Sequence, residues 1–155
     1  MLNHEEIARR IPHQGSMCLL ARVVEWNAQF IVCEADSHRD AVNPLRAYGR
    51  LGIACGIEYA AQAMAMHGAL LGAEGAGGSE QAPRAGYLAS VRGVTLHARR
   101  LDDIAGDLTV RAERVMGDSN HIIYSFAVAS HERPLLAGRA TVVLDASLLP
   151  RRENA

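Results

Sequence analysis

The fold is decided by the segment Cys55-Gly-Ile-Glu-Tyr-Ala-Ala-Gln-Ala-Met-Ala-Met-His-Gly-Ala-Leu-Leu-Gly72. Alanine and methionine dominate it and β-branched residues are nearly absent, which favours a helix. Its side chains are apolar on every face apart from Glu58, Gln62 and His67, and a helix that is apolar all round is a buried one. These three polar groups argue against a membrane span. The segment therefore predicts one long helix inside the core of the protein.

Glu58 is the most unusual residue of this helix. Helical geometry of about 100° per residue places Gln62 within about 40° of it and His67 on the opposite side, where we expect a structural role. A lone buried carboxylate is unstable unless it is paired, hydrogen-bonded or neutralised. We therefore expect Glu58 either to be a functional group whose pKa is raised by desolvation, or to cap the helix start, where the macrodipole stabilises a carboxylate. The residues alone leave both readings open.

Composition limits the classes of function. The 155 residues predict a single domain over 1–145 and a tail over 146–155. A net charge of −1 gives no basic surface for nucleic acid or an anionic membrane. All basic residues are arginines, which excludes Schiff-base catalysis by lysine. The first residues do not resemble a secretion signal. The three cysteines, Cys18, Cys33 and Cys55, form neither a metal motif nor a disulfide framework. We therefore expect a cytoplasmic protein.

Strand-like patterns surround the helix. A capping box of Asn3 and Glu6 predicts a short helix to about Arg10. Apolar runs with turn signals between them predict strands over 17–26, 29–36, 86–96, 108–115, 121–129 and 135–144. Loops over 37–52 and 73–85 flank the central helix. This order predicts an α+β fold with an antiparallel sheet wrapped around one long central helix.

Three segments resemble one family, the 3-hydroxyacyl-[acyl-carrier-protein] dehydratases. Ile11-Pro-His-Gln-Gly-Ser-Met-Cys-Leu-Leu-Ala-Arg-Val-Val-Glu25 is similar to the Pro-His turn and first strand of that family. Glu58-Tyr-Ala-Ala-Gln62 resembles the start of its central helix, which contains the catalytic acid, and Tyr87-Leu-Ala-Ser-Val-Arg-Gly-Val-Thr-Leu-His97 matches the strand after the helix. The resemblance covers about residues 5–145 and implies a hot-dog fold. Within the family, the chain looks most similar to the ApeP-like dehydratases of aryl polyene and related fatty-acid-type gene clusters.

The resemblance implies the dehydration of 3-hydroxyacyl thioesters to trans-2-enoyl thioesters. The substrate would be carried on the phosphopantetheine of acyl carrier protein, with no other cofactor and no metal. Glu58 would be the general acid, Gln62 would orient the site, and Gly56 would let the thioester approach a helix amide. The family's His-Phe-Pro-Gly loop is absent, and His38 is the histidine in the corresponding loop. We therefore expect His38 to act as the base, approaching Glu58 of a second subunit.

Two alternatives remain open on the sequence. A hot-dog thioesterase also places a carboxylate on the central helix, and a non-catalytic subunit would pair with a second hot-dog protein. Either a homodimer or such a heteromer would pair strands 86–96 across a two-fold axis. Arg46 and Arg84 are candidate contacts for the acidic carrier protein or the cofactor phosphate, whereas His13 is expected to be a structural turn residue.

Overall fold

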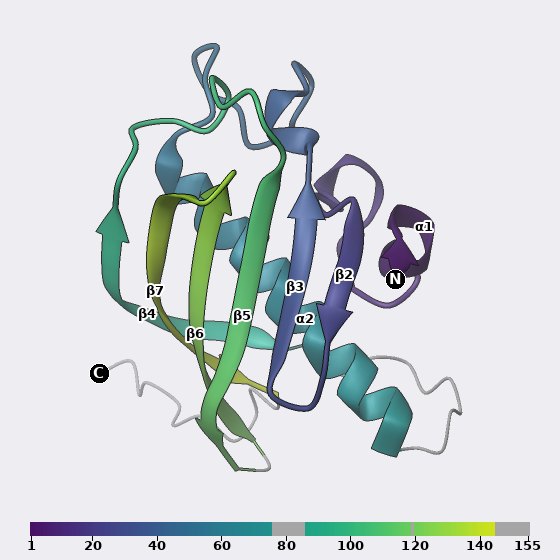
Figure 1. Cartoon of the computed structure of the whole chain (residues 1–155). Coiled ribbons are helices and arrows are strands. Elements are labelled where there is room, and N and C mark those ends of the chain that lie inside the picture. Colours follow the sequence, from purple (N-terminus) through teal and green to yellow (C-terminus); the bar gives the residue numbers. More distant parts are fainter. Residues whose placement is uncertain (76–85, 119, 145–155) are drawn as a thin grey trace, which may run out of the picture.

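The architecture is a curved antiparallel sheet with one long helix packed on its inner face (Figure 1). The computed structural model describes residues 1–75, 86–118 and 120–144. Helix α2 is Gly56–Gly75, and the seven-stranded sheet has the order β1-β2-β3-β5-β6-β7-β4. The strands are β1 (Leu2–Asn3), β2 (Arg22–Trp26), β3 (Phe30–Ala35), β4 (Tyr87–Leu96), β5 (Leu108–Gly117), β6 (His121–Ser130) and β7 (Arg133–Val143). The predicted hot-dog fold is confirmed.

The shorter elements follow their sequence signals. The predicted capping box is present, since Asn3 Oδ1 accepts from Glu6 N and Glu6 Oε2 accepts from Asn3 N, and α1 spans His4–Ala8. The 3₁₀ turns are η1 (Gly15–Met17), η2 (Ser37–Arg39) and η3 (Ile53–Cys55). Turn η1 is why the first predicted strand begins only at Arg22 rather than at residue 17.

Helix α2 is buried as its composition predicts. Tyr59, Ala60, Ala63 and Met66 have no exposed surface, and the helix packs on β3, β5 and β6. Full burial of a large apolar side chain stabilises a fold by about 1.5–3 kcal/mol, so this face anchors the core. The helix continues to Gly75, into the predicted loop over 73–85; the rest of that loop and the tail 146–155 lie outside the described residues.

His67 has the structural role expected of it, although not through charge. The Asn27 carbonyl accepts from Nε2 at 2.8 Å, and the Tyr124 hydroxyl lies 2.8 Å from Nδ1. Burial lowers the pKa of His67, so the ring is neutral rather than a cation stabilised by the helix end. The imidazole thus ties the helix to the β2–β3 turn and to β6.

Strand β4 lies at the edge of the sheet and is paired, among the described strands, with β7 alone. Three of its apolar side chains are largely exposed: Tyr87 at 53%, Leu88 at 43% and Leu96 at 51%. A long apolar edge favours pairing with another chain. Within the described ranges, no helix has both the length and the apolarity needed to cross a membrane.

The β6–β7 turn is strained. Its central residues, His131 and Glu132, have φ values of 46° and 64°, the left-handed region that both central positions of a type I′ hairpin require. Asn-Gly is preferred at such positions, and a side chain with a Cβ costs about 1–2 kcal/mol there.

Replacing this pair by Asn and Gly (His131→Asn with Glu132→Gly) is expected to raise the thermal midpoint by several degrees, because Gly and Asn tolerate positive φ. Differential scanning calorimetry measures the shift. Glu132→Ala is the matched control, since it removes the side chain but keeps the strain, and it should give no increase. An Asn-Gly variant no more stable than the parent would contradict the assignment of strain.

Candidate active site

The site is organised by the buried amide of Gln62, in the second turn of α2. Its Oε1 accepts from Leu19 N at 2.8 Å, and its Nε2 donates to the Met17 carbonyl at 2.7 Å and to Glu58 Oε1 at 3.2 Å. The side chain has no exposed surface, so these bonds are needed to offset its desolvation. They fix the chain after η1 against the helix and orient Glu58. Gln62 thus contacts Glu58, and its role in orienting the site stays a prediction.

These hydrogen bonds of Gln62 bring His13 close to Glu58. His13 lies in the turn between α1 and η1, which Gln14 stiffens by donating to the Ala8 carbonyl at 3.2 Å. The His13 Nε2 is 3.1 Å from Glu58 Oε1, and the two side chains are 25% and 33% exposed. The pair therefore lies at the boundary of the core and is partly open to solvent. His13 was expected to be a turn residue only.

The contact with His13 reverses the direction in which we expected the pKa of Glu58 to shift. The hydrogen bond from His13 is the largest cause of a lowered pKa, burial opposes it, and the hydrogen bond from Gln62 adds to the lowering. The expectation of a raised pKa was wrong because it weighed desolvation without a partner. Glu58 is therefore a carboxylate near neutral pH, suited to accept a proton. His13 Nδ1 is buried and has no hydrogen-bond partner within the described residues.

His38 lies elsewhere. It is in η2, is fully buried, and its Nε2 donates to the Ile104 carbonyl at 3.0 Å. Burial lowers the pKa of His38, which keeps the ring neutral. The structure does not join it to Glu58 of the same chain, and a side chain without exposed surface presents nothing for a second subunit to contact. This geometry corrects the expected approach of His38 to a partner's Glu58.

Gly56 serves packing in this structure. A Cβ at this position would overlap the Leu136 side chain of β7, so the absence of a side chain admits that leucine rather than a substrate. The Gly56 N–H is already bonded to the carbonyls of Ile53 and Ala54. The expected approach of a thioester to this amide therefore finds no support in the geometry.

Of the two arginines singled out in the sequence, Arg46 is engaged within the chain. Arg46 is 19% exposed and donates to the carbonyls of Asp40, at 2.8 Å, and His38, at 3.4 Å. It fixes the loop before the central helix. Arg84 lies outside the described residues.

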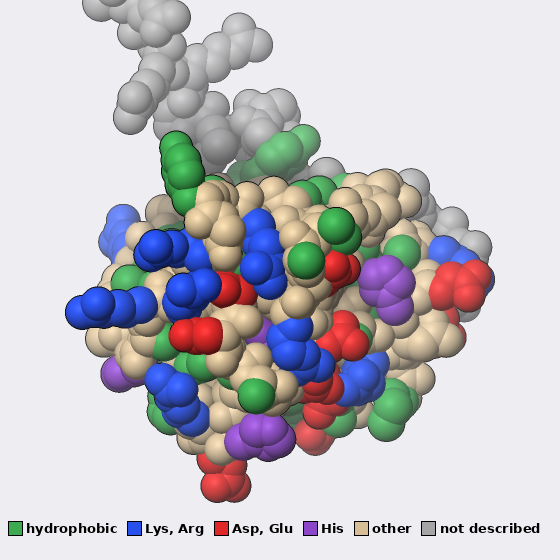
Figure 2. Space-filling view, turned by 90° about the horizontal axis from the view of Figure 1, so that it is seen from above, with side chains coloured by type: hydrophobic (Ala, Val, Ile, Leu, Met, Phe, Trp, Pro, Cys, Tyr) green, Lys and Arg blue, Asp and Glu red, His purple; other side chains and the backbone are tan. Residues whose placement is uncertain are grey.

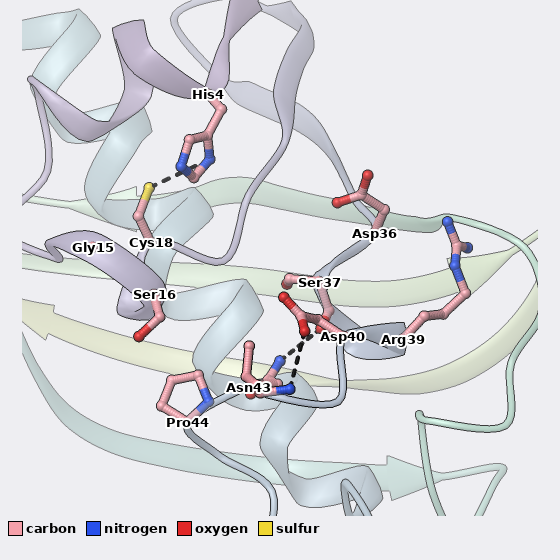
Figure 3. A pocket seen from close by; sticks show the side chains of 11 residues that line it. His4, Gly15, Ser16, Cys18, Asp36, Ser37, Arg39, Asp40, Asn43 and Pro44 are labelled. Atoms are coloured by element: carbon pink, nitrogen blue, oxygen red, sulfur yellow. Dashed lines mark hydrogen bonds between the residues drawn. The ribbon is translucent and has the colours of Figure 1, made fainter.

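A polar pocket of about 430 Å³ lies beside the site (Figure 3). It is formed by the N-terminal segment on one side and the loop after β3 on the other, and Tyr59 supports it from α2 by hydrogen bonds to Ser37, at 2.8 Å, and Asn43, at 3.1 Å. Burial raises the pKa of the Cys18 thiol in its wall, which argues against a thiolate nucleophile. The lining residues are His4, Gly15, Ser16, Cys18, Asp36, Ser37, Arg39, Asp40, Val42, Asn43 and Pro44.

The pocket and the Glu58–His13 pair are formed by neighbouring residues of the chain. Gly15 and Ser16 follow His13 in the chain, and Tyr59 follows Glu58. Neither Glu58 nor His13 lines the pocket itself. In the described part of the chain, no cluster of three or more His, Cys, Asp or Glu side chains could hold a metal ion.

Residues 5–149 match the model of a family described as ApeP-like, ApeP dehydratase. The chain belongs to the ApeP-like dehydratase family. The match takes in strands β2 to β7 and α2, so it includes Glu58, His13 and Gln62. None of the curated proteins compared with the chain is similar to it.

Solved structures agree on the fold of this ApeP-like chain. The dehydratase heterocomplex ApeI:P from Xenorhabdus doucetiae is 20% identical, with a TM-score of 0.77 and 90% of each chain covered. A Haemophilus influenzae thioesterase is 12% identical, with a TM-score of 0.63 and 98% of this chain and 96% of that one covered. A hypothetical thioesterase with coenzyme A from Streptococcus pneumoniae is 14% identical, with a TM-score of 0.56 and 80% and 84% covered.

His13 is the residue that sequence reasoning missed. Forty-five positions separate it from Glu58, and no periodicity within one element links residues so far apart. The available signal was its place in the Pro-His turn ahead of the first strand, together with Gln62 one helical turn after Glu58, which could join that turn to the helix.

Removing His13 is expected to raise the pKa of Glu58. In the native chain this pKa is below its ordinary value of 4.5, so the pair stabilises the fold above that pH and the stabilisation is lost as pH falls through the lowered pKa. His13→Ala removes the largest cause and leaves burial to act. A carboxyl-carbon NMR titration of Glu58 measures the shift.

His121→Ala is the control, because it deletes an exposed histidine 4.0 Å from a different carboxylate, Asp118. It should leave the Glu58 titration unchanged. An unaltered Glu58 midpoint in His13→Ala would show that the two groups do not interact in solution.

Proposed function

We propose that this chain acts in the dehydration of 3-hydroxyacyl thioesters carried on the phosphopantetheine of acyl carrier protein, forming trans-2-enoyl thioesters in a polyene or fatty-acid type of biosynthesis. Membership of the ApeP-like dehydratase family supports the reaction. The observation that carries the proposal is the Glu58–His13 contact of 3.1 Å, on the helix position at which the family resemblance places its acid. We also propose a cytoplasmic location and no further cofactor.

The pair can carry both proton transfers of the reaction. The Glu58 carboxylate takes the C2 proton, the C2–H electron pair forms the C2=C3 double bond, and the C3–O bond breaks. Protonated His13 gives its proton to the departing hydroxyl, which leaves as water. Glu58 then holds a proton and His13 is neutral, so a proton passed across their contact restores the starting state. General acid and base catalysis of this kind contributes about 10²–10⁴ in rate.

The exposed edge of β4 supports a proposal on assembly. A hot-dog subunit pairing along β4 would cover Tyr87, Leu88 and Leu96. The partner is a second copy of this chain or a second hot-dog protein. The similarity to the ApeI:P dehydratase heterocomplex favours the second, so this chain acts as one subunit of a heteromeric dehydratase.

One observation favours thioester hydrolysis as the alternative. The lowered pKa keeps Glu58 ionised near neutral pH. An ionised carboxylate can take a proton from water, whose oxygen then attacks the thioester carbonyl, and the leaving thiolate takes that proton from Glu58. Hydrolysis gives a free 3-hydroxy acid, whereas dehydration gives an enoyl thioester. The products therefore separate the two functions.

Incubation with a 3-hydroxyacyl carrier protein, followed by mass spectrometry, is expected to show loss of water without loss of the acyl group. Glu58→Gln should reduce this activity by about 10²-fold or more, because an amide keeps the shape but cannot accept the proton. Glu74→Gln, the same change at an exposed position of α2, is the matched control and should retain full activity.

The assay is run on the chain alone and on the chain mixed with a second hot-dog subunit. Enoyl product from the mixture only identifies a heteromeric dehydratase, and product from the chain alone identifies a self-sufficient one. Free acid without any enoyl product would establish the thioesterase. Full turnover by Glu58→Gln would remove the carboxylate from the mechanism.

A further inference from the structure

At one end of the molecule, arginine and acidic side chains lie side by side (Figure 2). This end carries the loops before α2 and after β4. Arg39 pairs with Asp107 there at 2.7 Å, and Arg100 pairs with Asp102. The positive charge of both arginines is thus balanced within the chain. A different arrangement occurs on the outer face of the sheet.

Arg92 and Arg139 lie directly opposite each other on the neighbouring strands β4 and β7. The adjacent residue Ala140 is buried and lies opposite Tyr124, whose hydroxyl contacts α2. Successive side chains of a strand point to opposite faces of the sheet, so the two arginines point away from the helix. Both are exposed. Like charges directly opposite each other destabilise a strand pair, so this pair calls for a compensating partner.

The described part of the chain does not supply that partner. Within it, neither Arg92 nor Arg139 has an ion pair or a side-chain hydrogen bond. In the same row of the sheet, Ser125 of β6 lies opposite Arg139, and Glu113 of β5 lies opposite Ser125. The Glu113 carboxylate is therefore separated from Arg139 by a whole strand, and it pairs with Arg111 at 3.4 Å. The charge of the two facing guanidinium groups is left uncompensated.

A hollow of about 290 Å³ is lined by both arginines, on the surface of β4, β7 and β6, which run side by side (Figure 1). Ser90 and Thr141 form a facing pair on the same side of β4 and β7, are half-buried, and add two hydroxyl groups to its lining. The hollow thus combines two cations with two hydroxyl groups and contains no carboxylate. The lining residues are Ser90, Arg92, Ile123, Arg139, Ala140 and Thr141.

A β-bulge shapes the backbone beside Arg92. The register of β4 against β7 shifts directly after this residue, and Gly93 has a φ of 58°. Gly138 packs under the bulge, where a Cβ would come within 2.9 Å of the Phe126 side chain and 3.3 Å of the Arg92 carbonyl. Bulges re-aim side chains and are over-represented next to functional sites. The position of Arg92 is therefore fixed by backbone packing and does not need an ion pair.

We propose that this hollow is a binding site for the phosphoryl group of a soluble small molecule. A phosphoryl group carries about two negative charges and three acceptor oxygens. Each guanidinium group donates two parallel hydrogen bonds to such a group, and the hydroxyls of Ser90 and Thr141 are further donors. These donors outnumber the lone pairs of one carboxylate. The site lies on the face of the sheet opposite α2, so the inference is independent of the proposed reaction.

The first test measures binding to the full chain in the assembly in which it purifies. The probes are inorganic phosphate and glycerol 3-phosphate, titrated by phosphorus NMR in chloride buffer at constant ionic strength, because salt screens exposed charges. Saturable binding to the wild type is expected. Arg92→Gln with Arg139→Gln should weaken it about tenfold or more, since it removes both charges and the paired hydrogen bonds.

A second test measures stability and has the opposite sign without ligand. In phosphate-free buffer, Arg139→Gln should raise the thermal midpoint by about 1–3 °C, because it removes the like charge opposite Arg92. Phosphate should raise the midpoint of the wild type more than that of the variant, because it binds the native state between the two arginines. An arginine pair with a purely structural role would show neither effect.

The matched control is Arg111→Gln, on the same outer face. Arg111 is 42% exposed, pairs with Glu113 and lies over the Phe30 ring, so its charge already has partners. This variant should change the dissociation constant less than about twofold, and it measures the general stabilisation of folded proteins by phosphate. If the double variant does not fold, as judged by its thermal transition, Arg139→Gln alone replaces it, with an expected weakening of about threefold.

Undetectable binding of both soluble probes to the wild type would overturn the proposal, as would equal weakening by Arg111→Gln. Acetate that competes as well as phosphate would contradict the assignment to a phosphoryl group. Binding to vesicles containing phosphatidic acid, without binding of the soluble probes, would contradict a soluble ligand. Tighter binding of glycerol 3-phosphate than of phosphate would identify a phosphomonoester as the ligand, and equal or weaker binding would identify inorganic phosphate.

Discussion

The hydrogen bonds of the Gln62 amide are the interaction on which the site depends. An amide buried in an apolar helix is unfavourable unless its donors and acceptor are satisfied, and this one is satisfied by Met17, Leu19 and Glu58. Two of these partners are backbone groups of the segment that follows His13. The need to satisfy one buried side chain thus fixes a coil segment on the helix and brings an imidazole to a carboxylate.

The other polar groups of α2 obey the same constraint. Tyr59 is hydrogen-bonded to Ser37 and Asn43, and His67 to Tyr124 and Asn27. Each bond joins the helix to a different part of the chain, so together they set its rotation and depth in the sheet. Glu58 differs because it is a third exposed and its partner is the His13 imidazole, which is itself 25% exposed. It is the polar group of the helix that remains open to a ligand.

The fold was predictable because its signals are local. The composition of the central segment predicted a buried helix, and alternating runs placed the four later strands to within two residues at either end. Glu58 was also predictable, since a carboxylate on an apolar helix is rare. His13 was not, because its role arises from a tertiary contact that depends on Gln62. The pKa of Glu58 was predicted with the wrong sign for the same reason, and His38 was misplaced because its loop folds inward onto Ile104.

We expect Glu58 and His13 to act as one catalytic unit. A double-mutant cycle on kcat tests it most directly, with Glu58→Gln, His13→Ala and the combined variant compared in the assembly that forms enoyl product. Residues that share one proton pathway give non-additive losses, so the combined variant should be no slower than the worse single variant. Losses that multiply in the combined variant would show that the two side chains act independently and would contradict the account.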